Sequence, residues 1–233
     1  MGYMTARDLT DLVLDVAAAL ILFGMIHYTS HYRKRGRIDD KIYFGMLVIT
    51  ILCALANAAA SAVDGIFGTG ADALKVALND IFFIAMDLSF CVMTVYFDQR
   101  SRKENALSKK RICVLSLPAV FTAIALAVNH RTHFIFWVDR TTGRYTELAH
   151  FYIIYLAPVL YAIAILVVCR WNKGALSVLI LLILARSVLE GVMRDVSSTA
   201  LFLAIVLVFI HINEMRYAFY DEERNAVEEK ERG

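Results

Sequence analysis

Long apolar runs separated by short polar segments dominate the pattern of this chain. The hydrocarbon core of a bilayer is about 30 Å thick, so a helix that crosses it needs roughly 20 apolar residues. Seven segments meet this requirement, at approximately residues 8–30, 40–63, 73–97, 110–129, 150–171, 174–191 and 196–213. Because no water reaches the hydrocarbon core to hydrogen-bond the backbone, each apolar segment has to satisfy its N–H and C=O groups internally, as a helix does. The pattern predicts an all-α integral membrane protein whose residues 1–213 form a seven-helix transmembrane bundle.

Basic residues are concentrated in alternate connections between these segments. The first, third and fifth connections carry clusters, at Arg33, Lys34, Arg35, Arg37 and Lys41, at Arg100, Arg102, Lys103, Lys109, Lys110 and Arg111, and at Arg170 and Lys173. The second connection, from Asp64 to Asp72, has none. Since cytoplasmic loops are enriched in Lys and Arg, we expect the N-terminus outside and the C-terminus in the cytoplasm. The predicted location is the bacterial cytoplasmic membrane, as a multi-pass protein in contact with membrane lipids.

Composition agrees with this prediction and excludes other classes. Apolar residues make up 59% of the chain, above the level of soluble domains. The formal net charge is only +2 and the basic residues follow the topology, which argues against nucleic-acid binding. All four cysteines fall inside apolar segments, so neither a disulfide nor a structural zinc site is expected. Nucleotide-binding, zinc-protease and nucleophile-elbow motifs are absent, so we expect no enzymatic activity.

The connection between the fourth and fifth segments, residues 129–149, has strand-like features. Phe134, Phe136 and Val138 alternate with other residues, residues 139–143 supply turn chemistry, and Tyr145 begins a return strand. This predicts a short extracellular β-hairpin that covers the bundle. An aromatic belt in the headgroup zone is the alternative, because aromatic side chains favour that depth.

The tail, residues 214–233, differs from the rest of the chain because it is highly charged and has no apolar run. We expect it to extend the seventh helix as a cytoplasmic signalling stalk. Ile212, Met215, Phe219 and Ala226 fall at a and d positions of a heptad, and Glu222 and Glu229 fill the other d positions. This polar seam predicts a homodimer whose pairing is easily switched. A solvated terminus is the alternative.

Ionisable groups inside a membrane are costly unless they are paired or hydrated, so each is a candidate for function. Asp15, Asn57, Asp80 and Arg186 lie roughly 5 to 10 Å outward of their helix centres at 1.5 Å per residue. Asp11, Asn79 and Glu190 lie a little further out. The residues expected to bind a ligand are Asp11, Asp15, Asn57, Asp80, Arg186 and Glu190, together with Trp137 of the hairpin. A small polar or charged ligand is the expected occupant. Interhelical ion pairs with Arg186 and Arg194 are the structural alternative.

Asp87 lies close to the centre of the third segment, with no basic residue at matching depth. We expect it to be protonated or hydrogen-bonded to a hydroxyl such as Thr50 or Ser89. A buried acid of this kind is also typical of a proton relay. It therefore supports an alternative function, that of a small secondary transporter.

Three histidines, His27, His31 and His211, lie at similar depth near the cytoplasmic side. Imidazoles at one level can bind a metal or a haem, and a haem- or metal-binding membrane protein is the third hypothesis. Histidine is also common where helices leave a bilayer, and the acids lie mostly on the opposite side, so we expect no metal. No lysine lies in the last segment or in the interior of another, which excludes a retinal protein. No cofactor is predicted.

A stretch around the fourth connection resembles a known family. An aromatic run ends in Asp at residues 134–139, a turn with Gly leads to an aromatic at 143–145, and residues 150–158 end in a proline within the next helix. This is similar to the outer loop and fifth helix of seven-helix sensor domains that precede histidine kinase or GGDEF-type diguanylate cyclase domains in anaerobic Gram-positive bacteria. The chain departs from the family at residues 147–150, where an Arg-Gly-Pro type cluster is common.

The resemblance implies a receptor that senses an extracellular or membrane-borne ligand. The signal would pass through the seventh helix to a cytoplasmic effector. Family members continue from the stalk into an effector domain, whereas this sequence ends at Gly233. We therefore expect a cytoplasmic signalling domain or a partner protein to receive the signal.

Overall fold

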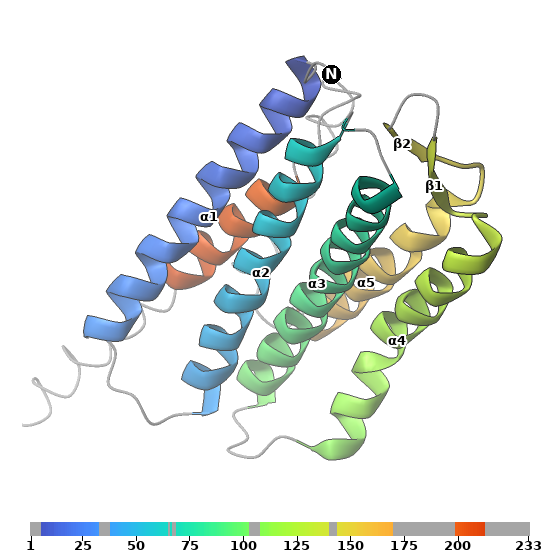
Figure 1. The fold of residues 1–233 in the computed structure, drawn as a ribbon. Helices are drawn as coiled ribbons and strands as arrows, with labels where there is room; N and C mark the ends of the chain where they lie inside the picture. The colour runs from blue at the N-terminus through green and yellow to red at the C-terminus, as the bar shows by residue number, and fades with distance from the viewer. Residues whose placement is uncertain are drawn as a thin grey trace, which may run out of the picture.

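The computed structural model describes residues 6–32, 38–64, 66, 69–102, 108–139, 144–169 and 199–212 (Figure 1). The elements are α1 (Ala6–Tyr32), α2 (Ile38–Val63), α3 (Thr69–Arg102), α4 (Lys109–Thr132), β1 (Phe136–Asp139), β2 (Arg144–Glu147), η1 (Phe151–Tyr155) and α5 (Leu156–Cys169). A further apolar helix spans Thr199–Ile212. Apart from the two short strands, the regular structure of the described residues is helical, as predicted.

Four helices are long and apolar enough to cross a membrane, with spans of Asp8–Thr29, Lys41–Val63, Gly70–Gln99 and Lys109–Thr132. The helices Phe151–Val167 and Thr199–Ile212 are apolar but shorter. The structure therefore has the character of an all-α membrane protein. The predicted segment 174–191 and the stalk 214–233 lie outside the described residues. The count of seven spans and the orientation in the membrane stay predictions.

The first four helices alternate in direction, and the strands lie where α2 ends and α3 begins (Figure 1). We call this the hairpin end of the bundle. α3 is central because it packs against α2, α4 and α5. Its buried face contributes Phe83, Met86 and Met93 to the core. α4 exposes much of its apolar surface, including Val114 and Phe121, as expected of a helix that faces lipid.

α4 ends in a turn that leads directly into the hairpin. His133 caps the helix in the left-handed conformation, with φ of 49°, and its N–H donates to the carbonyl of Asn129 at 2.8 Å. A residue in this conformation reverses the chain direction and satisfies a helix carbonyl. The chain then enters β1 at Phe136.

The predicted hairpin is confirmed. β1 and β2 pair antiparallel with Phe136 opposite Glu147 and Asp139 opposite Arg144. Side chains alternate along β1, so that Phe136 and Val138 are buried while Trp137 is exposed. Phe136 packs on Phe83 of α3 with ring centroids 6.0 Å apart. This contact fixes one face of the hairpin on the bundle.

Pro158 is the third residue of α5 and follows the 3-10 turn η1 directly. The resemblance predicted a proline that interrupts the fifth helix. The structure corrects its position, because the proline stands in the first turn of α5. A proline is tolerated there because it costs a helix fewer hydrogen bonds than in the interior.

The helix Thr199–Ile212 lies behind α1 and α2 in Figure 1, and its last turn contacts both of them toward the end of the bundle away from the hairpin. Tyr43 of α2 donates its hydroxyl to the carbonyl of Leu207 at 3.5 Å. His211 makes an edge contact with Tyr28 of α1, at 5.4 Å between centroids, and stacks on Tyr43 at 5.9 Å. The last described helix is therefore in direct contact with the first two.

Candidate functional site

Asp15 of α1 and Asn57 of α2 form a polar pair inside the bundle. Asn57 donates its Nδ2–H to Asp15 Oδ2 at 2.7 Å. Asp15 is fully buried and Asn57 nearly so. The second carboxylate oxygen, Asp15 Oδ1, is buried and has no hydrogen-bond partner among the described residues. An acceptor of this kind is costly unless a donor reaches it, so the pair is the first candidate for a binding site.

Small side chains explain how the pair forms. Alanines crowd both helices around it, including Ala18 and Ala19 on α1 and Ala54 on α2, and all three are buried. Small residues let two helix backbones approach closely, which brings side chains as short as Asp15 and Asn57 into contact.

Asp11 lies one turn from Asp15 on the same face of α1 and is also buried. The two carboxylates are close enough to repel each other when both are charged. A positive charge or several N–H donors placed beside Asp15 would relieve this repulsion. The geometry thus favours a cationic or donor-rich ligand over an anionic one.

Asp80 was predicted to share this layer, and the structure gives it a different partner. His130, in the last turn of α4, places Nε2 2.6 Å from Asp80 Oδ2. Asp80 is 14% exposed and His130 is 53% exposed, so the pair reaches solvent. Sequence reasoning missed His130. The available signal was its place directly after the predicted fourth segment, 110–129, at the end where Asp80 lies.

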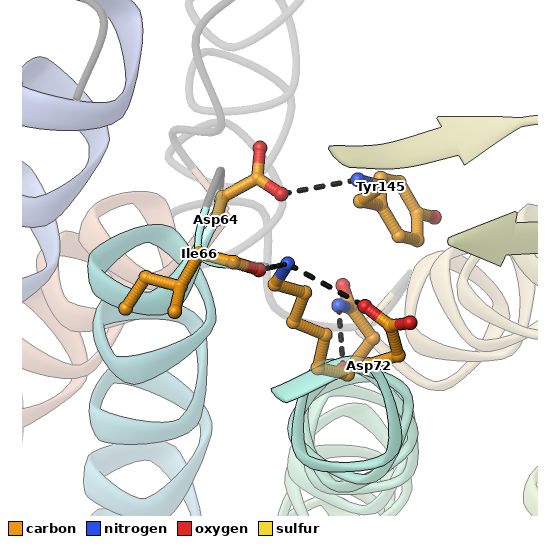
Figure 2. Close-up of polar contacts among 6 residues, drawn as sticks. Asp64, Ile66, Asp72 and Tyr145 are labelled. Carbon is orange, nitrogen blue, oxygen red and sulfur yellow. Dashed lines mark hydrogen bonds and ion pairs between the residues drawn. The ribbon is translucent and has the colours of Figure 1, made fainter. Parts of the chain in front are cut away.

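Lys75 is a second residue that sequence reasoning missed, because it sits only a few residues inside α3. It is 1% exposed, and its Nζ donates to the carbonyl of Ile66 and lies 3.9 Å from Asp72 Oδ1 (Figure 2). Asn79, expected in the ligand layer, instead donates to the carbonyl of Lys75 at 2.9 Å. These contacts hold the connection from α2 to the first turns of α3.

The hairpin is fastened to the helices through two polar side chains. Asp64, at the end of α2, accepts the backbone N–H of Tyr145 at 3.0 Å (Figure 2). Asn129 of α4 donates to the carbonyl of Phe136 at 3.0 Å, and its Oδ1 accepts the N–H groups of Ile135 at 2.8 Å and Phe136 at 3.3 Å. The hairpin is therefore an integral part of this end of the bundle.

Asp87 lies in the middle of α3 and is fully buried. Thr50 and Ser89, the hydroxyls expected to bind it, bind each other at 3.2 Å. That expectation was wrong because residues two apart on a helix point in different directions, so Ser89 faces α2. Thr122 of α4 is the hydroxyl that interacts with Asp87 instead, although the two side chains do not meet strict hydrogen-bond geometry with each other or with any other described residue.

The hydrogen-bond ladder of α4, not the helix itself, is interrupted near this acid. Pro118 lies inside the helix and has no N–H to donate. The neighbouring helices supply partners for the altered backbone: Ala119 N–H donates to Tyr161 Oη of α5 at 3.1 Å, and the Cys91 thiol of α3 donates to the Leu115 carbonyl at 3.5 Å. Polar groups from three helices therefore meet at the interruption.

The histidines do not form a metal centre in the part of the chain that the structure describes, where no group of three His, Cys, Asp or Glu is suitably placed. His211 lies between tyrosine rings, and His27 is exposed. The side chain of His31 lies outside the described residues. No sequence pattern indicated that the predicted segments 8–30 and 196–213 touch, and the contact of Tyr28 with His211 shows that they do.

The remaining predicted site residues are distributed as follows. Trp137 is 39% exposed, on the face of β1 opposite the buried Phe136. Arg186, Glu190 and Arg194 lie outside the described residues. Three residues that were predicted to share one layer, Asp11, Asp15 and Asn57, do lie together in the structure. Two others, Asp80 and Asn79, contact different residues, namely His130 and the Lys75 carbonyl.

Comparison of the chain with models of known protein families, with curated proteins and with solved structures gives no match.

Proposed function

We propose that this protein is a membrane receptor that binds a small ligand beside Asp15 and passes the signal through its last helix to a cytoplasmic effector. The ligand carries positive charge or several hydrogen-bond donors and arrives from outside the cell or from the membrane. The effector is a signalling domain or a partner protein, and the receptor acts as a homodimer in a bacterial cytoplasmic membrane.

The observation that carries this proposal is the buried carboxylate of Asp15 with one oxygen unsatisfied among the described residues. A buried acceptor without a donor costs about 1 to 3 kcal/mol, and more when it is charged. A bundle that served only as an anchor would be more stable with an apolar side chain at this position. A ligand that donates a hydrogen bond to Asp15 Oδ1 would remove this cost, which explains why a polar side chain is found at this position.

A route from this site to the last helix supports the second half of the proposal. Asp15 and Asn57 join α1 to α2 near the hairpin end, and the helix Thr199–Ile212 rests on the same two helices near the other end. Asp15 and Tyr28 are separated by about 20 Å along α1 at 1.5 Å per residue. A ligand that changes the packing of α1 on α2 therefore changes the surface on which the last helix sits. Signalling requires that the ligand bind the two arrangements with different affinity.

The charge distribution supports the proposed orientation. α2 begins, α3 ends and α4 begins at the end away from the hairpin, where basic residues gather at Lys41, Arg100, Arg102, Lys109, Lys110 and Arg111. Among the residues that the structure describes, the opposite end has fewer of them, so the positive-inside rule favours a cytoplasmic location for the basic end. The hairpin then faces outward, and the last helix runs toward the cytoplasm.

Ligand-induced stabilisation tests the binding site. The purified full chain is screened with a panel of primary amines, guanidino compounds and amino acids by thermal unfolding in detergent. A compound at 100 times its Kd stabilises the native state by about 2.7 kcal/mol. We expect such a compound to stabilise the wild type and the control Asp98→Asn, but not Asp15→Asn. Equal stabilisation of the wild type and Asp15→Asn would place the ligand elsewhere.

A small secondary transporter is the second candidate, favoured by a specific observation. A buried acid at the middle of a helix, Asp87, stands beside the helix interruption at Pro118, and transporters use such features at the membrane midplane. Substrate flux into liposomes that does not require residues 214–233 would favour transport. A signalling response that requires the tail would favour the receptor. The third hypothesis, a haem or metal protein, is tested by the visible spectrum of the purified chain.

A further inference from the structure

The proposed receptor function leaves the acid at the centre of the bundle unexplained. Asp87 stands about 4 Å from the midpoint of the span Gly70–Gln99, given 1.5 Å per residue. It is fully buried, and both of its carboxylate oxygens lack a hydrogen-bond partner among the described residues. The nearby hydroxyl of Thr122 is equally buried and also lacks a partner there. Two unsatisfied polar groups from adjacent helices thus face each other deep in an apolar layer.

The groups around Asp87 can be named helix by helix. Thr122 of α4 interacts with its side chain, and Cys53 of α2, Cys91 on the next turn of α3 and Tyr161 of α5 lie close enough to feel its charge. These thiols and hydroxyls are neutral groups, and none of the described neighbours supplies a positive charge. A lone carboxylate in such surroundings would cost several kcal/mol.

We propose that Asp87 and Thr122 form a binding site for a monovalent cation, either a proton or a sodium ion. Both occupants do the same thing chemically, which is to bring one positive charge to the buried carboxylate. For sodium, the carboxylate and the hydroxyl of Thr122 supply hard oxygen ligands. For a proton, the resulting carboxylic acid shares a hydrogen bond with Thr122, since a hydroxyl can donate or accept. The site uses none of the residues of the Asp15 site, so a failure of this proposal would leave the proposed receptor function untouched, and the reverse also holds.

Occupancy of the site affects α4 because of where Thr122 lies. Pro118 is one turn away on the same helix, where the backbone is already interrupted and held by Tyr161 and Cys91. A cation that draws Asp87 and Thr122 together therefore closes α4 onto α3 at its most deformable point. The far end of α4 holds the hairpin through Asn129, so the hairpin moves with it.

Thermal unfolding of the purified full chain tests the site. The midpoint is measured as sodium chloride replaces choline chloride at constant ionic strength, and separately as pH is lowered. A site that binds a cation only in the native state makes that state more stable as the sodium concentration rises or the pH falls. The variants are Asp87→Asn and Thr122→Val. The matched control is Asp98→Asn on the same helix, where the acid pairs with Arg111 at 3.6 Å near the helix end.

We expect the wild type and Asp98→Asn to gain stability from sodium or from acid. Asp87→Asn should not respond to sodium, and its gain from acid should be smaller than that of the wild type, because only the other buried carboxylates, such as Asp15, still take up a proton. If sodium is the occupant, Thr122→Val raises the half-saturating concentration about tenfold, because one oxygen ligand is lost. If a proton is the occupant, an infrared band of a carboxylic acid grows as pH falls and is missing from Asp87→Asn.

Three results would overturn the proposal. The first is a wild type whose stability depends on neither sodium nor pH. The second is a sodium or acid dependence that is as large in Asp87→Asn as in the wild type, which would assign it to another group. The third is a carboxylic acid band from Asp87 that does not change with pH, which would mark a permanent structural acid.

Discussion

Replacement of Asn129 by alanine should release the hairpin from the bundle while leaving the helices folded. The Asn129 side chain makes three hydrogen bonds to the backbone of the hairpin approach, and it is almost completely buried. Its loss would leave the N–H groups of Ile135 and Phe136 and the Phe136 carbonyl without these partners. Because Ile135 and Phe136 are themselves buried, water cannot replace the side chain without opening the structure.

The expected cost follows from the number of bonds. At about 0.5 to 1.5 kcal/mol per bond, three bonds give about 1.5 to 4.5 kcal/mol of local stability, or roughly 12-fold to 1,600-fold in the opening equilibrium. Hydrogen–deuterium exchange measures this quantity for individual segments. Amides of residues 135–148 should exchange faster by that factor in Asn129→Ala, while those in the middle of α2 and α3 keep the wild-type rate.

A matched control comes from the same turn of α4. Thr132 is exposed, and its hydroxyl binds only the carbonyl of Val128 in its own helix, at 3.0 Å. Thr132→Ala should leave hairpin exchange unchanged. Wild-type exchange of residues 135–148 in Asn129→Ala would refute the view that this side chain fastens the hairpin.

Three further outcomes follow from the buried polar contacts. Tyr161→Phe removes the acceptor of the Ala119 N–H beside Pro118 and should lower the free energy of unfolding by about 1 to 3 kcal/mol, measured by denaturant titration in detergent. Lys75→Met should lower the free energy of unfolding by a similar amount, because Asp72 and the Ile66 carbonyl lose the Lys75 ammonium group as a partner. As a control, Lys41→Met at an exposed position should have no measurable effect. A double-mutant cycle between Asp80→Asn and His130→Ala should give a coupling energy of at most about 1 kcal/mol, because the pair is partly exposed. A coupling energy of zero would mean that the two side chains do not interact.

The helices and the hairpin could be predicted because each depends on information that is local in the sequence. A membrane helix requires only a long apolar run, so the predicted bounds 73–97 and 110–129 lie within α3 and α4 as observed. The hairpin required alternation and a turn, both of which residues 134–145 display. Neither feature depends on how the helices are rotated about their axes.

The partners of the polar residues could be predicted only in part, because they depend on that rotation. Depth alone placed Asp15, Asn57 and Asp80 in one layer, and the structure joins the first two while Asp80 turns toward α4 and meets His130. Depth also failed for Asp87, whose supposed partner Ser89 faces α2. Which face of a helix meets which neighbour is decided by packing of the whole bundle, and a single sequence does not display it.

In the proposed receptor, the Asp15 site controls the position of the helix Thr199–Ile212, and a distance measurement tests this directly. Two exposed side chains, Phe23 on α1 and Phe209 on the helix Thr199–Ile212, can be replaced by p-acetylphenylalanine and spin-labelled without altering the native cysteines. Asp15→Asn removes the charge that a cationic ligand would neutralise. Pulsed electron resonance on the full chain in nanodiscs should show a shifted distance distribution between the labels in Asp15→Asn and an unchanged one in Asp98→Asn. Identical distributions in the wild type and Asp15→Asn would contradict the account.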